Sequence, residues 1–340
     1  MRNAINPFPT VPRRQKTPTM KPANRLLSLV AMAVALGLVG QPAVAQGTGW
    51  PRTIGDGPLA LTLKSPPKRV VSTTPSVTGV LLAIGAPVIA SAATTPSLFT
   101  DGKGFFSQWA SVADARGVAV LYPSLKFDIE AVIAARPDLA IASVTGADSV
   151  LQHRAALEAQ GVPTLVVNYS DRSWQDLAME LGRATGLERQ AGDAVSRFDA
   201  EVAEAAARLA PPRSTVSIVG YNIGGSYSVA RLTSPVAKLI SALGFEVVAL
   251  PAALRANSAR PSDFEFFSRE NLSAAIAGET VFLLRATEKD VQAFLADPVL
   301  ANHPAVIKRQ VYPLGPTSHR IDPYSGRQIV EKMLGFFGRP

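Results

Sequence analysis

The feature that most constrains the fold is a strand followed directly by a turn and a helix, in residues 68–85. A β-branched run at Val70 and Val71 predicts a buried strand, Thr73 to Ser76 predict a turn ending in a helix N-cap, and Gly85 closes the helix. The same alternation continues along the chain. It predicts an α/β fold with mostly parallel central sheets flanked by helices.

One long helix interrupts this alternation. Its apolar positions fall on a single stripe, its other faces are charged, and Pro211 and Pro212 end it. Beyond it, strands are expected near residues 214–220, 245–249, 280–284 and 310–313. We therefore predict two lobes and one backbone helix: an N-terminal lobe at 46–186, the linking helix at 187–210 and a C-terminal lobe at 211–340.

Residues 1–45 are expected to be a secretory leader and not part of the fold. Residues 26–40 form an apolar run without a charge that is short for a membrane span, with Lys21 and Arg25 before it and a small-residue site ending at Ala45. Cleavage is predicted after Ala45, and Met20 is an alternative start. The mature protein is expected in the periplasm, without a membrane span.

The net charge of the whole chain is dominated by this leader. The chain has 34 basic and 26 acidic residues, but six basic residues and no acidic one lie in 1–45. The remaining 28 basic and 26 acidic residues nearly balance, so no nucleic-acid partner is expected. The chain has no cysteine, which excludes disulfides, thiol nucleophiles and thiolate metal sites.

Catalytic and metal-binding patterns are weak in this sequence. The histidines, His153, His303 and His319, are dispersed, and there is no Gly-x-Ser-x-Gly elbow. A metal receptor would need several histidines and carboxylates together. We predict no catalytic residue, no metal site and no cofactor, and hence a binding protein and not an enzyme. A hydrolase and an envelope sensor or structural protein remain alternatives.

The loops that follow the strands are the expected ligand-binding elements. In open parallel sheets, ligands lie at the carboxyl ends of the strands, so Thr73 and Thr74 are expected to face the crevice. These loops are rich in cations and aromatic rings and contain few carboxylates. From them we select the following ligand-binding candidates: Lys103, Trp109, Arg172, Tyr227, Arg255, Arg260 and Arg320.

Short motifs resemble the iron-siderophore and cobalamin class (class III) of periplasmic binding proteins. They are Arg69–Ser72, Leu82–Ser91, Ala135–Leu139 and Leu243–Phe245. Finer matches resemble members that bind ferric enterobactin: Ala93–Pro96, Gly146–Ser149, Asn168–Tyr169 with Ser173–Trp174, and Arg320–Asp322 with Tyr324–Ser325. The resemblance covers nearly all of residues 50–337. It implies capture of a ferric catecholate siderophore and delivery to an inner-membrane ABC permease.

The inventory of loop residues agrees with this ligand class. A ferric tris-catecholate carries three negative charges over flat rings, so its receptor needs cations and stacking surfaces. Thr95 joins the candidates through the Ala93–Pro96 match, and Tyr227 stands where such binders can offer a tryptophan. Another iron complex or cobalamin is the alternative ligand. Iron is expected only inside the ligand, and a monomer is expected.

Overall fold

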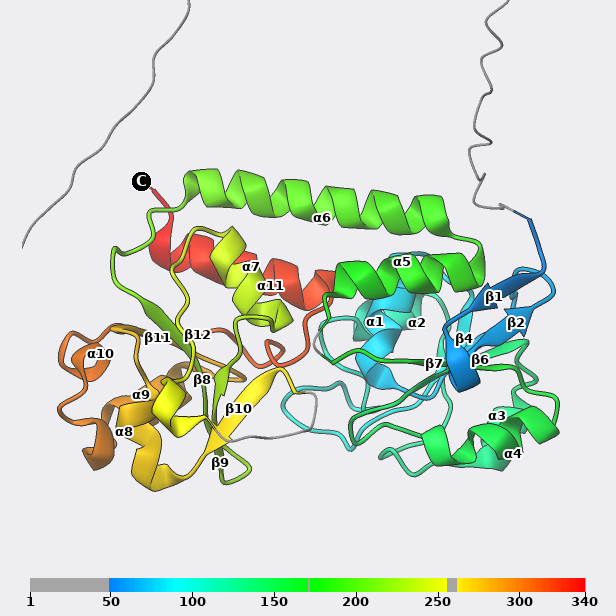
Figure 1. Ribbon diagram of the computed structural model, residues 1–340, viewed down its shortest axis with the longest axis horizontal. Helices are drawn as coiled ribbons and strands as arrows, with labels where there is room; N and C mark the ends of the chain where they lie inside the picture. The colour runs from blue at the N-terminus through cyan, green and yellow to red at the C-terminus, as the bar shows by residue number, and fades with distance from the viewer. Residues whose placement is uncertain (1–48, 171, 256–261, 340) are drawn as a thin grey trace, which may run out of the picture. The chain divides into compact units, whose positions relative to one another are not determined.

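The computed structural model describes residues 49–339 except residue 171 and residues 256–261. These residues belong to one compact unit. It contains two five-stranded sheets, one on each side of a long helix in chain order (Figure 1). The predicted leader and Arg260 lie outside the described residues.

The first sheet is entirely parallel, with strand order β5-β4-β3-β6-β7. Its strands are β3 (Val70–Ser72), β4 (Val88–Ser91), β5 (Ala119–Val120), β6 (Leu139–Ser143) and β7 (Thr164–Val167). Central strands β3 and β6 are buried along their whole length, as expected for a parallel sheet covered on both faces. A two-stranded antiparallel pair, β1 (Arg52–Ile54) with β2 (Leu61–Leu63), precedes this sheet.

Five helices follow the strands of the N-terminal lobe. They are α1 (Pro75–Ala83), α2 (Ala110–Ala115), α3 (Ile129–Ala134), α4 (Arg154–Ala159) and α5 (Trp174–Thr185). Helix α5 illustrates how the sequence sets their limits. The Ser173 hydroxyl caps its start by accepting from the Asp176 amide, and Gly186 ends it in the left-handed conformation.

Helix α6 (Glu188–Arg208) is the linking helix, within two residues of its predicted limits. In Figure 1 it extends along both lobes, with α5 beneath one half and α11 (Pro323–Phe337) beneath the other. Its buried stripe includes Ala191, Phe198 and Val202. The predicted fold class is therefore confirmed, while the exact lobe limits remain a prediction.

The second sheet has strand order β10-β9-β8-β11-β12 and is only partly parallel. Its strands are β8 (Val216–Ile223), β9 (Ser226–Ala230), β10 (Phe264–Phe267), β11 (Thr280–Leu283) and β12 (Val311–Pro313). Strands β8, β11 and β12 are parallel, whereas β9 and β10 pair in antiparallel fashion. The strand predicted near 245–249 is wrong, because only a single bridge between Val216 and Val247 forms there.

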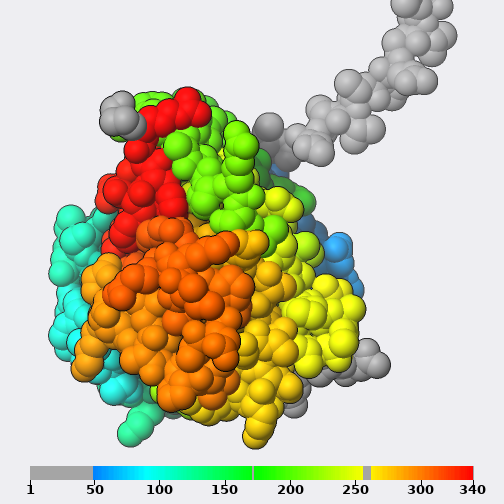
Figure 2. Space-filling model, turned by 90° about the vertical axis from the view of Figure 1, so that its left-hand side faces the viewer, coloured from blue at the N-terminus to red at the C-terminus, as the bar shows by residue number. Residues whose placement is uncertain are grey.

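The remaining C-terminal helices are α7 (Pro235–Ala242), α8 (Leu272–Ala275), α9 (Glu288–Leu295) and α10 (Pro304–Ile307). Short 3-10 turns lie at Gly57–Leu59, Leu151–His153, Ala252–Leu254, Arg269–Asn271 and Pro298–Leu300. Figure 2 views the molecule from the C-terminal lobe, where the segment around α9 and α10 forms the orange surface. The largest core cluster contains residues of both sheets and of α6, so the lobes share one continuous core.

Candidate functional site

Three polar residues of the C-terminal lobe meet aromatic rings of the N-terminal lobe at the carboxyl ends of the strands. Arg285 follows β11, and His319 and Arg320 follow β12. Phe99 and Phe106 lie in the loop after β4, and Tyr169 follows β7. We name this set the arginine–aromatic cluster: Phe99, Phe106, Tyr169, Arg285, His319 and Arg320. Its position is where ligands of open α/β sheets are held.

Arg285 stacks on a ring and has no carboxylate partner among the described residues. Its guanidinium carbon lies 4.0 Å from the centre of the Phe99 ring. Within the described ranges its Nε is buried without a hydrogen-bond partner, and its backbone amide donates to Ser318 Oγ at 2.9 Å. Burial lowers the pKa of Arg285. A partly buried cation without an acid partner is a strong indicator of an anion site.

Arg320 has two partners. Its guanidinium carbon lies 4.2 Å from the centre of the Tyr169 ring, across the lobe boundary. Its Nη1 lies 3.6 Å from Oδ2 of Asp263, a separation at which a planar guanidinium keeps other N–H groups for a ligand. The sequence-predicted candidate Arg320 therefore lies inside the cluster.

His319 lies among the cluster's charges but is itself neutral. Burial, together with the nearby charges of Arg320 and Arg285, lowers its pKa to about 3. Its ring and that of Phe106 meet edge to face with 5.5 Å between centres, and its Nδ1 has no hydrogen-bond partner in the part of the chain that the structure describes. The positive charge of the cluster at neutral pH therefore belongs to the two arginines.

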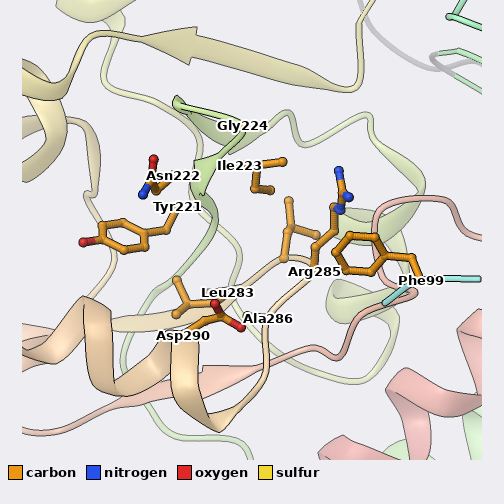
Figure 3. A pocket seen from close by; sticks show the side chains of 10 residues that line it. Phe99, Tyr221, Asn222, Ile223, Gly224, Leu283, Arg285, Ala286 and Asp290 are labelled. Carbon is orange, nitrogen blue, oxygen red and sulfur yellow. The ribbon is translucent and has the colours of Figure 1, made fainter. Parts of the chain in front are cut away.

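Two adjacent cavities open beside these arginines. One of about 220 Å³ lies between Tyr221, Phe99 and Arg285, and Figure 3 shows the Arg285 side chain between Ile223 and the Phe99 ring. The other, of about 230 Å³, is lined by both arginines, His319 and the rings of Phe264 and Phe266. Both cavities share Ile223, Leu284 and Arg285. The combined lining has aromatic walls and two arginines, and its one carboxylate in the described ranges, Asp290, accepts from the Thr287 amide and hydroxyl.

The other sequence-predicted cations are engaged in ion pairs away from these cavities. Lys103 pairs with Asp114, Arg172 pairs with Glu180, and Arg255 donates to the Leu250 carbonyl and lies 3.9 Å from Glu265. Thr95 is exposed in the loop after β4 and does not line either cavity. The structure therefore brings Arg320, alone of the described candidates, into the cluster.

Two aromatic candidates are buried elsewhere. Trp109 is fully buried against Phe105 and does not reach either cavity. The sequence predicts Tyr227 in a loop, which is wrong: β8 and β9 form a hairpin whose turn, Gly224–Gly225, has positive φ at both residues. Because side chains alternate along a strand, that of Tyr227 points into the core, where its hydroxyl accepts from the Arg269 guanidinium.

The threonines after β3 are also buried, and neither lines the two cavities. Thr73 donates to the Ile141 carbonyl, and Thr74 donates to Asp148. The candidates selected from the sequence include neither Arg285 nor the rings of Phe99 and Tyr169. Arg285 is among the loop cations of the sequence, two residues beyond a buried strand, but nothing local sets it apart from the others. Which ring each arginine meets depends on the other lobe and has no local signal.

Among the described residues, no three histidine or carboxylate side chains are arranged to hold a metal ion. No helix in the described ranges has the length and apolar character to cross a membrane.

Two α/β lobes on one linking helix, with cations and rings meeting between them, are the architecture of a two-lobed binding protein. The chain belongs to the periplasmic binding protein family, whose profile matches residues 70–317. It is 40% identical over 302 residues to the ferric enterobactin-binding periplasmic protein FepB of Escherichia coli O6:H1, covering 87% of this chain and 93% of that protein. The resemblance found in the sequence is thus confirmed.

Solved structures agree with this assignment. The crystal structure of holo-ViuP matches with a TM-score of 0.79 and 40% identity, covering 86% of this chain and 96% of that one. The FhuD protein from S. pseudintermedius matches with a TM-score of 0.61 at 16% identity, covering 81% of this chain and 94% of that one. The second similarity concerns the fold alone.

Proposed function

We propose that this protein captures a ferric siderophore of the enterobactin type at the arginine–aromatic cluster and delivers it to an inner-membrane ABC permease. The observation that carries the proposal is Arg285, a partly buried cation stacked on Phe99 beside a cavity, without an acid partner in the described ranges. Identity of 40% to a ferric enterobactin-binding protein supports the same ligand class.

The cluster suits the chemistry of a ferric tris-catecholate. Its three negative charges need cations, and its flat catechol rings need faces on which to stack. Arg285 and Arg320 supply the charge, and Phe99, Phe264 and Phe266 supply rings around the cavities. Iron would enter and leave inside the siderophore, and the protein would bind it without catalysis, as a monomer in the periplasm after removal of residues 1–45.

Intrinsic fluorescence titrations test this proposal. Ferric enterobactin, ferrichrome, cobalamin and Zn²⁺ are titrated in parallel, and we expect the strongest quenching with ferric enterobactin. Preference for ferrichrome or cobalamin would instead assign one of the alternative ligands. A protein that responds to none of the four would not be a receptor of this kind.

A second experiment tests charge recognition by removing Arg285, which has no acid partner in the described ranges. Arg285→Ala is expected to weaken ferric enterobactin binding about ten- to a hundredfold, because a charge-assisted contact with a buried guanidinium contributes roughly 1.5–3 kcal/mol. The control is Arg213→Ala, which removes an equal charge from an exposed position away from both cavities. Equal affinities of the two variants would contradict the placement of the site.

A further inference from the structure

Arg320 is contacted from both lobes. The Tyr169 ring covers one face of its guanidinium at 4.2 Å, and Asp263 lies 3.6 Å from its Nη1. Its Nε is buried and has no hydrogen-bond partner among the described residues. The ring of Tyr169 is therefore one of two contacts that direct this side chain.

Tyr169 is in turn fixed by a carboxylate. Its hydroxyl donates to Asp148 Oδ1 at 2.6 Å, and both side chains are buried. Asp148 Oδ2 accepts from the Thr74 hydroxyl at 2.5 Å and from the Ser76 amide at 3.3 Å, at the start of α1. Burial and the charge of Asp148 raise the pKa of Tyr169, so the hydroxyl keeps the proton that it donates.

The backbone leaves space for this pair at Gly146. A Cβ there would lie 1.8 Å from the Tyr169 hydroxyl and 2.6 Å from Asp148 Oδ1, and Gly146 has a φ of +89° that other residues rarely adopt. Tyr169 is thus held at its hydroxyl end by a tightly packed, hydrogen-bonded carboxylate. The ring of Phe99, on which Arg285 stacks, has no such polar anchor because it lacks a hydroxyl.

We propose that Asp148 is a positioning residue that acts through Tyr169 on Arg320, so that the N-terminal lobe sets how a C-terminal arginine meets an anionic ligand. A guanidinium covered on its face keeps its edge N–H groups for the ligand. A phenol that donates to a carboxylate has a more negative ring face, which strengthens the stacking of the cation. The identity of the anion rests on the proposed function, but the positioning does not.

Simple electrostatics and positioning predict opposite results for Asp148→Asn. If charge alone mattered, removing the negative charge of Asp148 would tighten the binding of an anionic ligand, because it would remove a repulsion. Positioning predicts instead that ferric enterobactin binds about three- to tenfold more weakly. Tyr169→Phe, which keeps the ring and loses only the anchor, should weaken it similarly. Asp138→Asn is the matched control, since Asp138 accepts from two backbone amides of the same lobe and does not contact Tyr169.

A double-mutant cycle separates positioning from general damage to the fold. With Arg320→Ala already present, Asp148→Asn should cause no further loss of affinity. Equal losses with and without Arg320 would overturn the proposal, as would binding by Asp148→Asn that is as tight as that of the wild type.

A ligand-free measurement distinguishes failure of this proposal from failure of the proposed function. The Nε–H resonance of Arg320, assigned by its loss in Arg320→Ala, should show a ring-current shift in ¹⁵N-arginine spectra of the wild type. This shift should shrink in Asp148→Asn, while the corresponding shift of Arg285 over Phe99 is retained. An unchanged Arg320 resonance would refute the positioning whatever the ligand, and a wild type that binds no siderophore would refute only the proposed function.

Discussion

Single residues in this protein combine several tasks, and Asp322 is the clearest case. Its Oδ1 accepts from the Tyr324 and Ser325 amides and so caps α11. Its Oδ2 accepts from the Gln108 amide of the other lobe at 3.3 Å. A Cβ at Gly79 would lie 2.4 Å from the same oxygen, so α1 approaches this carboxylate closely. One side chain therefore both starts a helix and joins the lobes.

The pH dependence of stability should reveal this carboxylate. Burial raises the pKa of Asp322 from 3.8 to about 6, so the folded protein binds this proton more tightly than the unfolded chain does. The contribution of Asp322 to stability therefore rises as the pH falls through 6 towards 4, by on the order of 2–3 kcal/mol, and is lost at higher pH. Urea unfolding between pH 4 and 8 measures it.

Asp322→Asn is the reference for this measurement, because asparagine also caps helices but does not titrate. The stability of Asp322→Asn relative to the wild type should increase from pH 4 to pH 8, and other titrating groups cancel in the difference. Parallel pH profiles of the two proteins would show that Asp322 is not a buried titrating group.

Among the elements, α11 shows how closely the helices of this protein pack. The helix crosses α6 at Gly326, where a Cβ would lie 2.6 Å from Cζ of Phe198. Phe198 is buried and meets Trp174 edge-on, with 5.2 Å between ring centres, so it has little room to move. Arg327 adds a bidentate ion pair with Glu201 of α6.

Two glycine substitutions in α11 should have opposite effects on stability. Gly326→Ala is expected to destabilise the protein by about 1–3 kcal/mol, because the new methyl group overpacks against Phe198. Gly335→Ala, in the same helix with nothing within 4 Å of its Cβ, should stabilise it by about 0.5–1 kcal/mol through helix propensity. Thermal or urea unfolding compares them, and equal stabilities would argue against the close crossing.

In the molecule as a whole, the two sheets share one core. The largest cluster runs from Val70 and Ile141 of the first sheet through Phe198 of α6 to Ile218 and Phe282 of the second. Stacking of Arg285 on Phe99 and of Arg320 on Tyr169 joins the lobes on the ligand side. Lobes tied together in this way should not unfold independently.

Unfolding is accordingly expected to be a single cooperative transition. All three tryptophans, Trp50, Trp109 and Trp174, precede α6, so their fluorescence reports the N-terminal lobe and, through Trp174, its contact with Phe198 of α6, whereas far-ultraviolet circular dichroism reports both lobes. The two signals should give coincident urea transitions. Phe198→Ala, which removes a ring from the shared core, should destabilise the protein by about 3–5 kcal/mol. Of the variants considered, it is the one most able to separate the unfolding transitions of the two lobes. Separate transitions in the wild type would contradict a shared core.

The sequence by itself determined the α/β alternation and most of its strands and helices. Strand and helix periodicities depend on near neighbours, so the first βα unit, the linking helix and the α/β class could be predicted, and the family followed from motifs along the chain. Strands β9 and β10 had no such pattern and were missed, because they are defined by antiparallel pairing with one another and with β8, and the strand expected near 245–249 does not form.

Only the tertiary structure decided which loop residues form the site. Loop cations look alike in sequence, yet Lys103 and Arg172 pair with nearby carboxylates, while Arg285 and Arg320 reach rings more than 150 residues away in the chain. Those contacts exist because α6 brings the carboxyl ends of two sheets together, and no local pattern encodes which side chains then meet. The tertiary structure therefore defines the arginine–aromatic cluster, in which Tyr169 stacks on Arg320 and donates its hydroxyl proton to Asp148.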